Sequence, residues 1–248
     1  MKSPYQLSRP QKLYVVCAAI FITALVVAEA TAGKLFTVVN LPFTLNILGE
    51  SFDRVIMTAG VIAFPITFII TDLLNEYYGK DGIRFVTYIG MVMIMFEFGL
   101  IQVAMAVPAD SISPVPGAAF DTVFGASGRI IIGSLVAYGI GQLADISLFH
   151  WIRGLTKGKH LWLRATGSTF GSQFLDTFIV LFIAFYGPMS LQTIIAITLF
   201  NYAYKFIVAI IITPLIYGAH WLMDKYLGHE TADELIHAAE TDNVDLST

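Results

Sequence analysis

The stretch Leu13–Ala32 has the sequence LYVVCAAIFITALVVAEATA, in which Glu29 is the only charged residue. A helix needs about 20 predominantly apolar residues to cross the roughly 30 Å hydrocarbon core of a bilayer, where its backbone polar groups must be satisfied internally. The stretch is therefore predicted to be a membrane-spanning helix. We expect it to be retained rather than cleaved as a signal peptide, because it is long for a signal sequence and Glu29 sits at the Ala30-Thr31-Ala32 motif.

Five further apolar runs of similar or greater length follow along the chain. They are Val55–Leu74, Ile83–Val107, Arg129–Phe149, Ala165–Tyr186 and Leu191–Leu222. The last run carries Pro214, so we expect it to tilt, to kink near the proline or to end in an interfacial turn. The sequence thus predicts an all-α, polytopic membrane protein with six transmembrane helices, formed by a single domain over residues 1–228.

The composition supports this class of protein. Of the 248 residues, 56% are hydrophobic and only 13% are charged, and the mean hydropathy is +0.74. A soluble domain carries about 25% charged residues. These values disfavour a soluble enzyme, a nucleic-acid-binding protein and a disordered chain. A disulfide scaffold is also disfavoured, because Cys17 is the only cysteine.

The orientation follows from the 14 lysines and arginines, which gather in cytoplasmic loops. If the N-terminus is cytoplasmic, the cytoplasmic side holds Lys2, Arg9, Lys12, Lys80, Arg84, Arg153, Lys157, Lys159, Arg164 and Lys225. The opposite side holds Lys34, Arg54 and Arg129, while Lys205 lies within the last span. We therefore expect both termini to be cytoplasmic.

Three connecting segments also carry expectations. Phe36–Leu48 is apolar but contains Pro42, so it is expected to be an external cover or a short hairpin. Pro108–Gly128, with three prolines, is expected to be an external loop. Residues 229–248 form an acidic cytoplasmic tail, predicted to be a short helix followed by disorder.

Polar residues inside the predicted spans are costly in lipid, so each is a candidate functional residue. The substrate-binding candidates are Gln142, Asp145, Gln173, Asp176, Asn201 and Lys205. The gating or coupling candidates are Glu29, Asp72, Asn75, Glu76, Glu97 and Arg164. Many of these lie three or four residues apart and so share one helix face, which must point into the bundle or a watery cavity.

Structural roles for the same residues stay open. The glutamines could join helices by hydrogen bonds alone. Asp72, Asn75 and Glu76 could cap their helix or pair with Lys80 and Arg84. Lys205 could serve as a counter-ion for Asp145 or Asp176, and Glu97 could be held protonated against a neighbouring helix.

An enzyme is disfavoured by the motifs. The five histidines are expected in loops or the tail, and the sequence contains no His-Glu-x-x-His, Gly-x-Ser-x-Gly or Walker motif. We therefore expect no catalytic residues, no metal site and no cofactor. A channel is disfavoured because no filter-like segment is present. A carrier of a small polar molecule makes use of donors and acceptors within the membrane.

Three motifs, in this order along the chain, resemble those of one family. They are FPITFIITDLLNEYYGK at 64–80, AYGIGQLAD at 137–145 and WLRATGSTFGSQFLDT at 162–177. This pattern is similar to the queuosine precursor transporter family, also called the VUT or YhhQ family. The resemblance covers most of the predicted spans two to six and leaves out the first 30 residues and the acidic tail.

The resemblance implies a bacterial inner-membrane protein of six helices that takes up 7-cyano-7-deazaguanine (preQ0) and 7-aminomethyl-7-deazaguanine (preQ1) for tRNA modification. A deazaguanine presents a ring N–H beside an exocyclic amine, which one carboxylate can accept together, and a carbonyl to which Gln, Asn or Lys can donate. Our hypothesis is that Asp145 or Asp176 binds the two-donor edge. Gln142 and Gln173 would bind the remaining polar atoms, and Phe149, Phe170, Phe178 or Tyr202 would stack on the ring.

The resemblance assigns no individual role to any of these positions, and the energy source stays open. Glu29, Glu97 or Asp72 are the candidates for a coupled proton, and facilitated diffusion fits equally well. One alternative is the substrate-binding subunit of an energy-coupling-factor vitamin importer, whose alanine-spaced first helix is echoed by Ala24, Ala28 and Ala32. The other is a membrane-embedded enzyme or sensor. A homo-oligomer and an energy-coupling partner both stay open.

Overall fold

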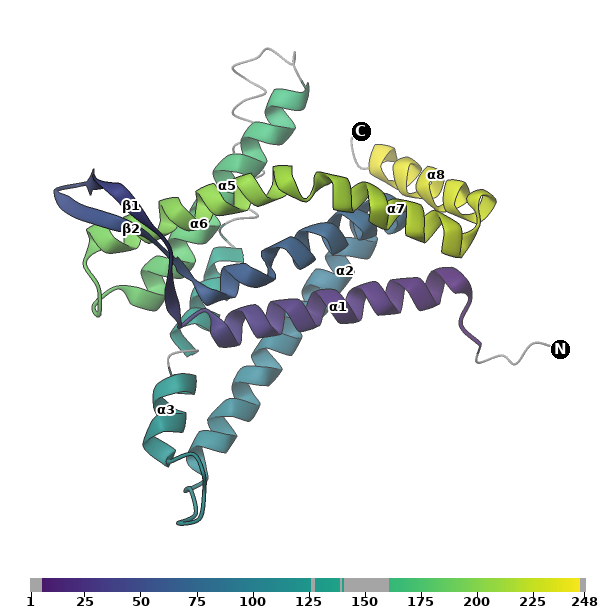
Figure 1. The fold of residues 1–248 in the computed structure, drawn as a ribbon. Coiled ribbons are helices and arrows are strands. Elements are labelled where there is room, and N and C mark those ends of the chain that lie inside the picture. Colours follow the sequence, from purple (N-terminus) through teal and green to yellow (C-terminus); the bar gives the residue numbers. More distant parts are fainter. Residues whose placement is uncertain (1–5, 126–127, 139, 141–160, 246–248) are drawn as a thin grey trace. The chain divides into compact units, whose positions relative to one another are not determined.

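The computed structural model describes residues 6–125, 128–138, 140 and 161–245. Helices dominate, and a single two-stranded sheet is present among these residues. In chain order the elements are α1 (Arg9–Thr31), β1 (Leu35–Ile47), β2 (Glu50–Thr58), the 3-10 helix η1 (Ala59–Ala63), α2 (Phe64–Ala106), α3 (Gly117–Gly125), α5 (Leu161–Phe185), α6 (Leu191–Ile211), α7 (Thr213–Leu227) and α8 (His229–Asp245). Residues 128–138 are also helical. Figure 1 shows these elements along the chain.

The chain divides into two structural units. The first unit consists of Met1–Ala28, Ile62–Glu97 and Phe206–Thr248. The second unit consists of Glu29–Val61 and Phe98–Lys205. Each unit therefore combines segments that are far apart in the sequence.

The first unit is built from α1, most of α2, α7 and α8. Its buried core contains Cys17, Phe21, Ile70, Leu73, Leu74, Tyr77, Val86, Met223, Leu227 and Ala232. Small residues let the helices approach closely: a Cβ on Gly90 of α2 would lie 2.9 Å from Leu25 Cδ1 of α1. Such close packing matters in lipid, because lipid tails are as apolar as the side chains and the hydrophobic effect therefore does not drive the helices together.

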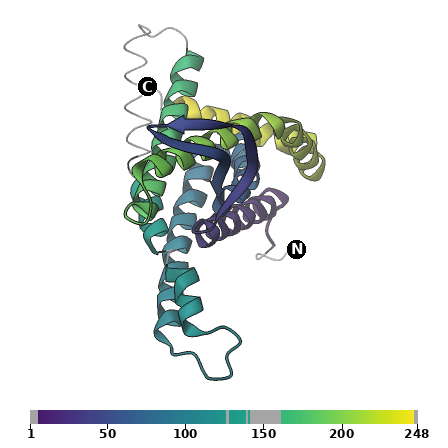
Figure 2. The same cartoon turned by 60° about the vertical axis from the view of Figure 1, so that its left-hand side comes forward.

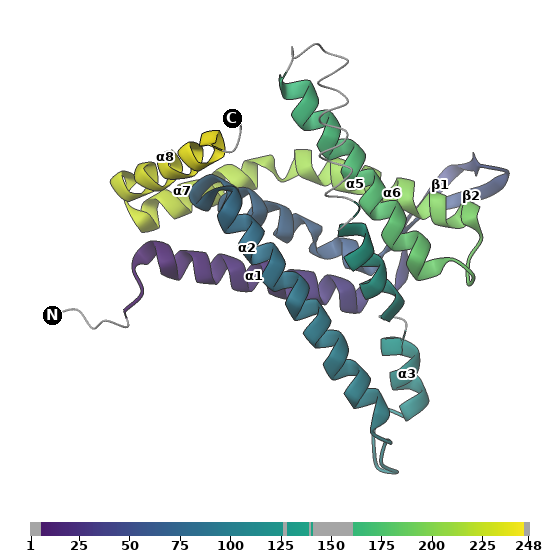
Figure 3. The same cartoon turned by 180° about the vertical axis from the view of Figure 1, so that it is seen from behind.

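Helix α2 is interrupted at Gly79, which has φ 66° and ψ −175°. This backbone conformation is essentially confined to glycine. The ribbon of α2 changes direction part-way along its length (Figure 3), and the backbone angles at Gly79 show that α2 is two helices joined at this residue. The predicted boundaries of the second and third spans are therefore wrong in detail. Residues 55–58 belong to β2 and 59–63 to η1, and helix resumes directly after Gly79.

The second unit contains the hairpin that the sequence placed at Phe36–Leu48, and the hairpin extends over Leu35–Thr58 (Figure 2). Its turn has positive φ at both Leu48 (49°) and Gly49 (89°), as a two-residue type I′ turn requires. The pairing shifts register between Asn40 and Leu45, a segment that includes Pro42, and proline cannot donate to the ladder. A hairpin does form here, but the prediction that Phe36–Leu48 makes a hairpin by itself is wrong, because this segment is the first strand and the start of the turn, and Glu50–Thr58 supplies the second strand.

The prediction of a loop over Pro108–Gly128 is wrong in part, because α3 occupies Gly117–Gly125. The carbonyl of Pro116 accepts the amides of Ala119 and Phe120, at 3.0 and 3.1 Å. The three prolines all precede this segment, so nothing in GAAFDTVFG prevents a helix.

Three helical segments in the described part of the chain are long and apolar enough to cross a membrane: Arg9–Thr31, Ala59–Ala106 and Leu191–Ile211. The stretch Gly117–Tyr138 also has the required length and hydropathy, with residues 126–127 outside the described set. Within α5, the apolar helical segment Gln173–Phe185 is shorter. The structure therefore agrees with a helical membrane protein, and the total of six spans stays a prediction.

The predicted disturbance at Pro214 is confirmed. Helix α6 ends at Ile211, and α7 begins at Thr213 with the proline in its first turn, where its missing N–H costs nothing. The acidic tail is helical as predicted, but α8 is longer than the short helix expected, since it extends over His229–Asp245. Its Ala232 joins the core of the first unit.

Candidate functional site

A polar cluster joins α5 to α6 in the second unit. Lys205 Nζ donates to Thr177 Oγ1 at 3.1 Å, and the Thr177 hydroxyl donates to the Gln173 carbonyl at 2.9 Å. The positive charge of Lys205 also acts on the neighbouring carboxyl of Asp176. Thr177 is buried, Asp176 and Lys205 are partly buried, and the Gln173 side chain is exposed. The structure thus brings together three of the six predicted substrate-binding residues: Gln173, Asp176 and Lys205.

Aromatic rings lie beside this cluster on the same two helices. Tyr202 of α6 meets Phe174 of α5 edge to face, with ring centroids 5.5 Å apart and planes at 87°. Phe178, another predicted stacking residue, packs instead on Phe182 of its own helix, with centroids 5.7 Å apart. Of these two candidates, Tyr202 is the one whose ring packs across from α6 to α5 beside Lys205.

Asn201 has a different environment from the rest of the predicted set. Its Nδ2 donates to the Ile197 carbonyl at 2.9 Å. Its Oδ1 lies 3.3 Å from Thr58 Oγ1 and 3.4 Å from Thr58 N, at the end of β2. Both ends of the amide are therefore bonded to protein, and Asn201 ties the hairpin to α6.

The predicted gating residues Glu29 and Glu97 lie in different surroundings. Glu29, at the end of α1, accepts a hydrogen bond at 2.7 Å from the hydroxyl of Ser134, on helix 128–138. Both residues belong to the second unit. Glu97 lies on α2, and one of its carboxylate oxygens is buried with no hydrogen-bond partner among the described residues.

Asp72 has a hydrogen-bond partner that the sequence did not indicate. Its Oδ2 lies 2.9 Å from Nε2 of His220, on α7. The suggested pairing of Asp72 with Lys80 or Arg84 is therefore wrong: Arg84 pairs weakly with Asp81, at 3.6 Å. Asn75 and Glu76, on the same helix, are exposed.

Tyr77 connects His220 to a second carboxylate, that of Asp224. Tyr77 donates its hydroxyl hydrogen to Asp224 Oδ1 at 2.6 Å, and His220 Nδ1 lies 3.3 Å from the same hydroxyl oxygen. The rings of Tyr77 and His220 are stacked, with centroids 5.5 Å apart. The expectation that every histidine lies in a loop or the tail is wrong for His220, which lies on α7 and within the apolar run Leu191–Leu222 itself. The helical spacing of His220 and Asp224, four residues apart, was the signal that could have found this pair.

Five predicted residues cannot be compared in this way. Gln142, Asp145 and Phe149 lie outside the described residues. Arg164 and Phe170 lie within α5, but their side chains are outside the described set. Their assignments stay predictions.

Comparison with known sequences identifies proteins related to this chain. A family model described as "Putative vitamin uptake transporter" matches residues 58–219, which include Asp72, Asp176 and Lys205. The chain is 34% identical over 164 residues to a "Probable queuosine precursor transporter" of Bacillus subtilis (strain 168), covering 65% of this chain and 71% of that protein.

The chain belongs to the queuosine precursor transporter family. A second relative, from Haemophilus influenzae (strain ATCC 51907 / DSM 11121 / KW20 / Rd), is a "Probable queuosine precursor transporter" and is 31% identical over 194 residues, which are 73% of this chain and 77% of the relative. A third, the "Queuosine precursor transporter" of Escherichia coli (strain K12), is 27% identical over 164 residues, or 65% and 71% of the two chains. No solved structure matches the chain.

Membership of the queuosine precursor transporter family gives the chain a transporter role in a membrane. The family match contains every residue of the polar cluster between α5 and α6. It ends at residue 219, directly before His220 and Asp224. The network of the first unit therefore combines family positions on α2 with α7 positions beyond the family match.

Proposed function

We propose that this transporter takes up the 7-deazaguanine bases preQ0 and preQ1 across the bacterial inner membrane, with both of its termini in the cytoplasm. The observation that carries the proposal is that a carboxyl and an ammonium group, Asp176 and Lys205, lie near enough to interact electrostatically on two apolar helices of a queuosine precursor transporter, with Lys205 hydrogen-bonded to Thr177 beside Asp176. Charged groups in such helices are costly and are typically kept for the transported molecule or ion.

The chemistry of the base matches this cluster. Asp176 offers two acceptor oxygens side by side, as the ring N–H and exocyclic amine of a deazaguanine require. Lys205 donates to the ring carbonyl while its charge balances the carboxylate. Gln173, three residues before Asp176 and on the same helix face, extends the polar surface. The Tyr202 ring, held edge to face by Phe174, offers a surface for stacking.

The remaining predicted residues take supporting roles. Asn201 could reach a substrate only by exchanging its bonds to Ile197 and Thr58, so we assign it a positioning role. Gln142 and Asp145 stay candidates for the opposite side of the base, and Arg164 for the cytoplasmic entrance.

The first test is uptake of labelled preQ0 and preQ1 into proteoliposomes that contain only this protein. Asp176→Asn keeps the size of the side chain but replaces one acceptor oxygen by a donor, so binding of a two-donor edge is lost. We expect uptake to fall by at least tenfold, towards the level of empty vesicles, while the amount of protein in the membrane is unchanged.

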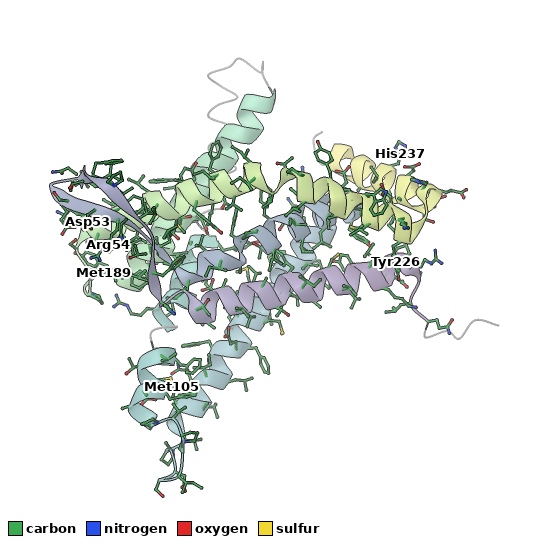
Figure 4. All side chains as sticks on the ribbon, viewed as in Figure 1. Asp53, Arg54, Met105, Met189, Tyr226 and His237 are labelled. Carbon is green, nitrogen blue, oxygen red and sulfur yellow. The ribbon has the colours of Figure 1, made fainter. Side chains whose placement is uncertain are left out.

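Asp53→Asn is the matched control, because Asp53 lies on the hairpin with 79% of its side chain exposed (Figure 4). Its uptake should equal that of the wild type. Normal uptake by Asp176→Asn would overturn the assignment of this carboxylate. Binding of the bases by the wild type without any flux would point instead to an importer subunit that needs a partner.

A further inference from the structure

We infer that Asp72, His220, Tyr77 and Asp224 form a proton-binding site that couples transport to the proton gradient. The inference rests on the proposed function for the molecule that is moved. It concerns different residues, which all lie in the first unit. The four side chains join α2 to α7 through three contacts, of 2.9, 3.3 and 2.6 Å.

The number of hydrogens in this network carries the argument. Tyr77 has one hydroxyl hydrogen, and its 2.6 Å contact with Asp224 has the length of a hydroxyl donating to an ionised carboxylate. The Tyr77 oxygen can then only accept from His220 Nδ1. Asp72 accepts from His220 Nε2 on the other side of the ring. All three contacts are satisfied together when both ring nitrogens carry hydrogen, that is, when His220 is an imidazolium.

Loss of one proton forces the network to rearrange. When Nδ1 of His220 releases its hydrogen to water, two lone pairs face each other across the 3.3 Å contact with Tyr77. The Tyr77 hydroxyl can turn to donate to Nδ1, but Asp224 then loses its donor. One proton therefore decides whether Tyr77 bonds to Asp224 or to His220, and both of these partners lie on α7.

The network runs from an outer contact to the core of the first unit. The side chain of His220 is 23% exposed and that of Asp72 is 46% exposed, so protein atoms leave the outer contact open for a proton to arrive or depart. Tyr77 is only 1% exposed and lies in the core beside Leu74. The network thus connects a partly exposed hydrogen bond to a buried residue of the packed core.

Other charged groups near the network are few among the described residues. On α2, Glu76 acts electrostatically on Tyr77. From α1, Arg9 donates to the carbonyl of Tyr226 at 3.4 Å, near the end of α7 (Figure 4). On α7, Lys225 lies 5.0 Å from the ring centre of Trp221. From α8, Ala232 packs into the same core, and the acidic Asp233 and Glu234 are exposed. Asp72 and Asp224 are the only carboxylates hydrogen-bonded to the His220–Tyr77 pair in this part of the structure.

Chain connectivity gives the proton site a route to the substrate cluster. Helix α6 carries Lys205, and it is followed after one residue by α7, which carries His220. The break at Ile212 lies between them, with Pro214 in the first turn of α7. In our proposal, a change in the bonding of Tyr77 acts on α7 and reaches α6 through this one-residue junction.

The test separates translocation from coupling in proteoliposomes. Counterflow, the exchange of labelled outside base for unlabelled inside base at equal pH, reports translocation alone. Accumulation under an inward proton gradient reports coupling, and one proton per base would give up to about tenfold accumulation per pH unit. We expect His220→Gln to keep counterflow and to lose accumulation, so that the base only equilibrates. His229→Gln, an exposed position on α8, is the matched control and should accumulate normally.

Accumulation by His220→Gln equal to the wild type would overturn the inference. So would counterflow without gradient-driven accumulation in the wild type, although the proposed function would then stand. Absence of counterflow in the wild type would instead count against the proposed function.

A measurement without substrate tests the proton-binding site separately from the proposed function, even if the wild type shows no counterflow. In isotope-labelled protein in nanodiscs, the ¹⁵N signals of His220, assigned with His220→Gln, and the ring ¹³C signal of Tyr77 should change together as pH is varied. Independent changes would overturn the switch. In Tyr77→Phe, the ¹⁵N signals of His220 should still change with pH, but gradient-driven accumulation of the base should be lost.

Discussion

The two polar clusters both bridge a pair of helices, but they use different chemical groups. In the second unit, a lysine from α6 meets a threonine and a carboxyl of α5. In the first unit, a histidine of α7 stands between a carboxylate of α2 and a tyrosine that bonds a second carboxylate. Lysine is normally charged throughout the physiological range, whereas the ordinary titration of histidine falls within it. The comparison teaches that one cluster suits a constant electrostatic contact with a ligand and the other a change of proton number.

The largest effect in this comparison should come from removing the positive charge of Lys205. Lys205→Met removes the positive charge that acts on Asp176 and the donor to Thr177. We expect counterflow of preQ0 and preQ1 to fall by tenfold or more. Lys205→Arg keeps the charge but not the geometry of an ammonium group, so it should retain part of the activity.

Thr177→Val separates the two roles of Lys205, because it removes the hydroxyl contact and leaves the charge in place. Its loss of counterflow should be smaller than that of Lys205→Met. A Lys205→Met variant with normal counterflow but no response to a pH gradient would exchange the roles assigned to the two clusters.

A smaller effect is expected at Gly79, the residue at which α2 is interrupted. Gly79→Ala places a side chain at φ 66°, although the nearest atom, Ala239 Cα, would be at an ordinary distance of 3.4 Å. The cost is therefore conformational, about 1–3 kcal/mol. Measured by thermal unfolding in detergent, the melting temperature should fall by several degrees.

Gly218→Ala is the matched control in α7, where an added Cβ would meet no atom within 4 Å. Alanine is the better helix former, so this variant should be unchanged or slightly more stable. Because Tyr77 is two residues from Gly79, the strained variant should also lose gradient-driven accumulation more than counterflow. Equal loss of both would mean that the turn supports the whole transporter rather than the first unit's network.

The sequence predicted the polar cluster of the second unit better than that of the first. Asp176 and Lys205 stand out because each interrupts a long apolar run, and that signal is local. The predicted apolar span over Leu13–Ala32 corresponds to α1 for the same reason. Asp72 was also found, but its partner was not. The hydrogen bond between Asp72 and His220 depends on how α7 continues after Pro214 and on which faces of α2 and α7 meet. The local sequence pattern predicts neither.

Backbone conformation explains the other differences from the sequence-based expectations. The second predicted span began too early, because the apolar residues Val55 and Ile56 fit a strand and a helix equally well. The contacts of β2 with α6, such as Thr58 with Asn201, decide in favour of the strand. In α3, three prolines nearby suggested a loop, although all of them precede the helix.

The smallest effect compares carboxylates at the starts of two helices, one in each unit. Glu50 of β2 accepts hydrogen bonds from Ser190 and Thr193 at the start of α6, at 2.9 Å for the shortest contact to each. Glu230 is exposed in the first turn of α8. A negative charge at a helix N-terminus contributes about 0.3–1 kcal/mol in either place. Glu50 also receives two hydroxyl donors, which a neutral glutamine accepts less strongly.

We therefore expect Glu50→Gln to lower the melting temperature by about 2–4 °C, which corresponds to roughly 1 kcal/mol, and Glu230→Gln to lower it by less. Both variants should retain counterflow, since neither residue belongs to the substrate cluster. If the two variants melt alike, the hydroxyl contacts of Glu50 add nothing beyond the helix terminus. The attachment of the hairpin to α6 would then rest on Asn201, on the apolar contacts of Leu35 and Ile56, and on the Phe52–Phe200 ring pair.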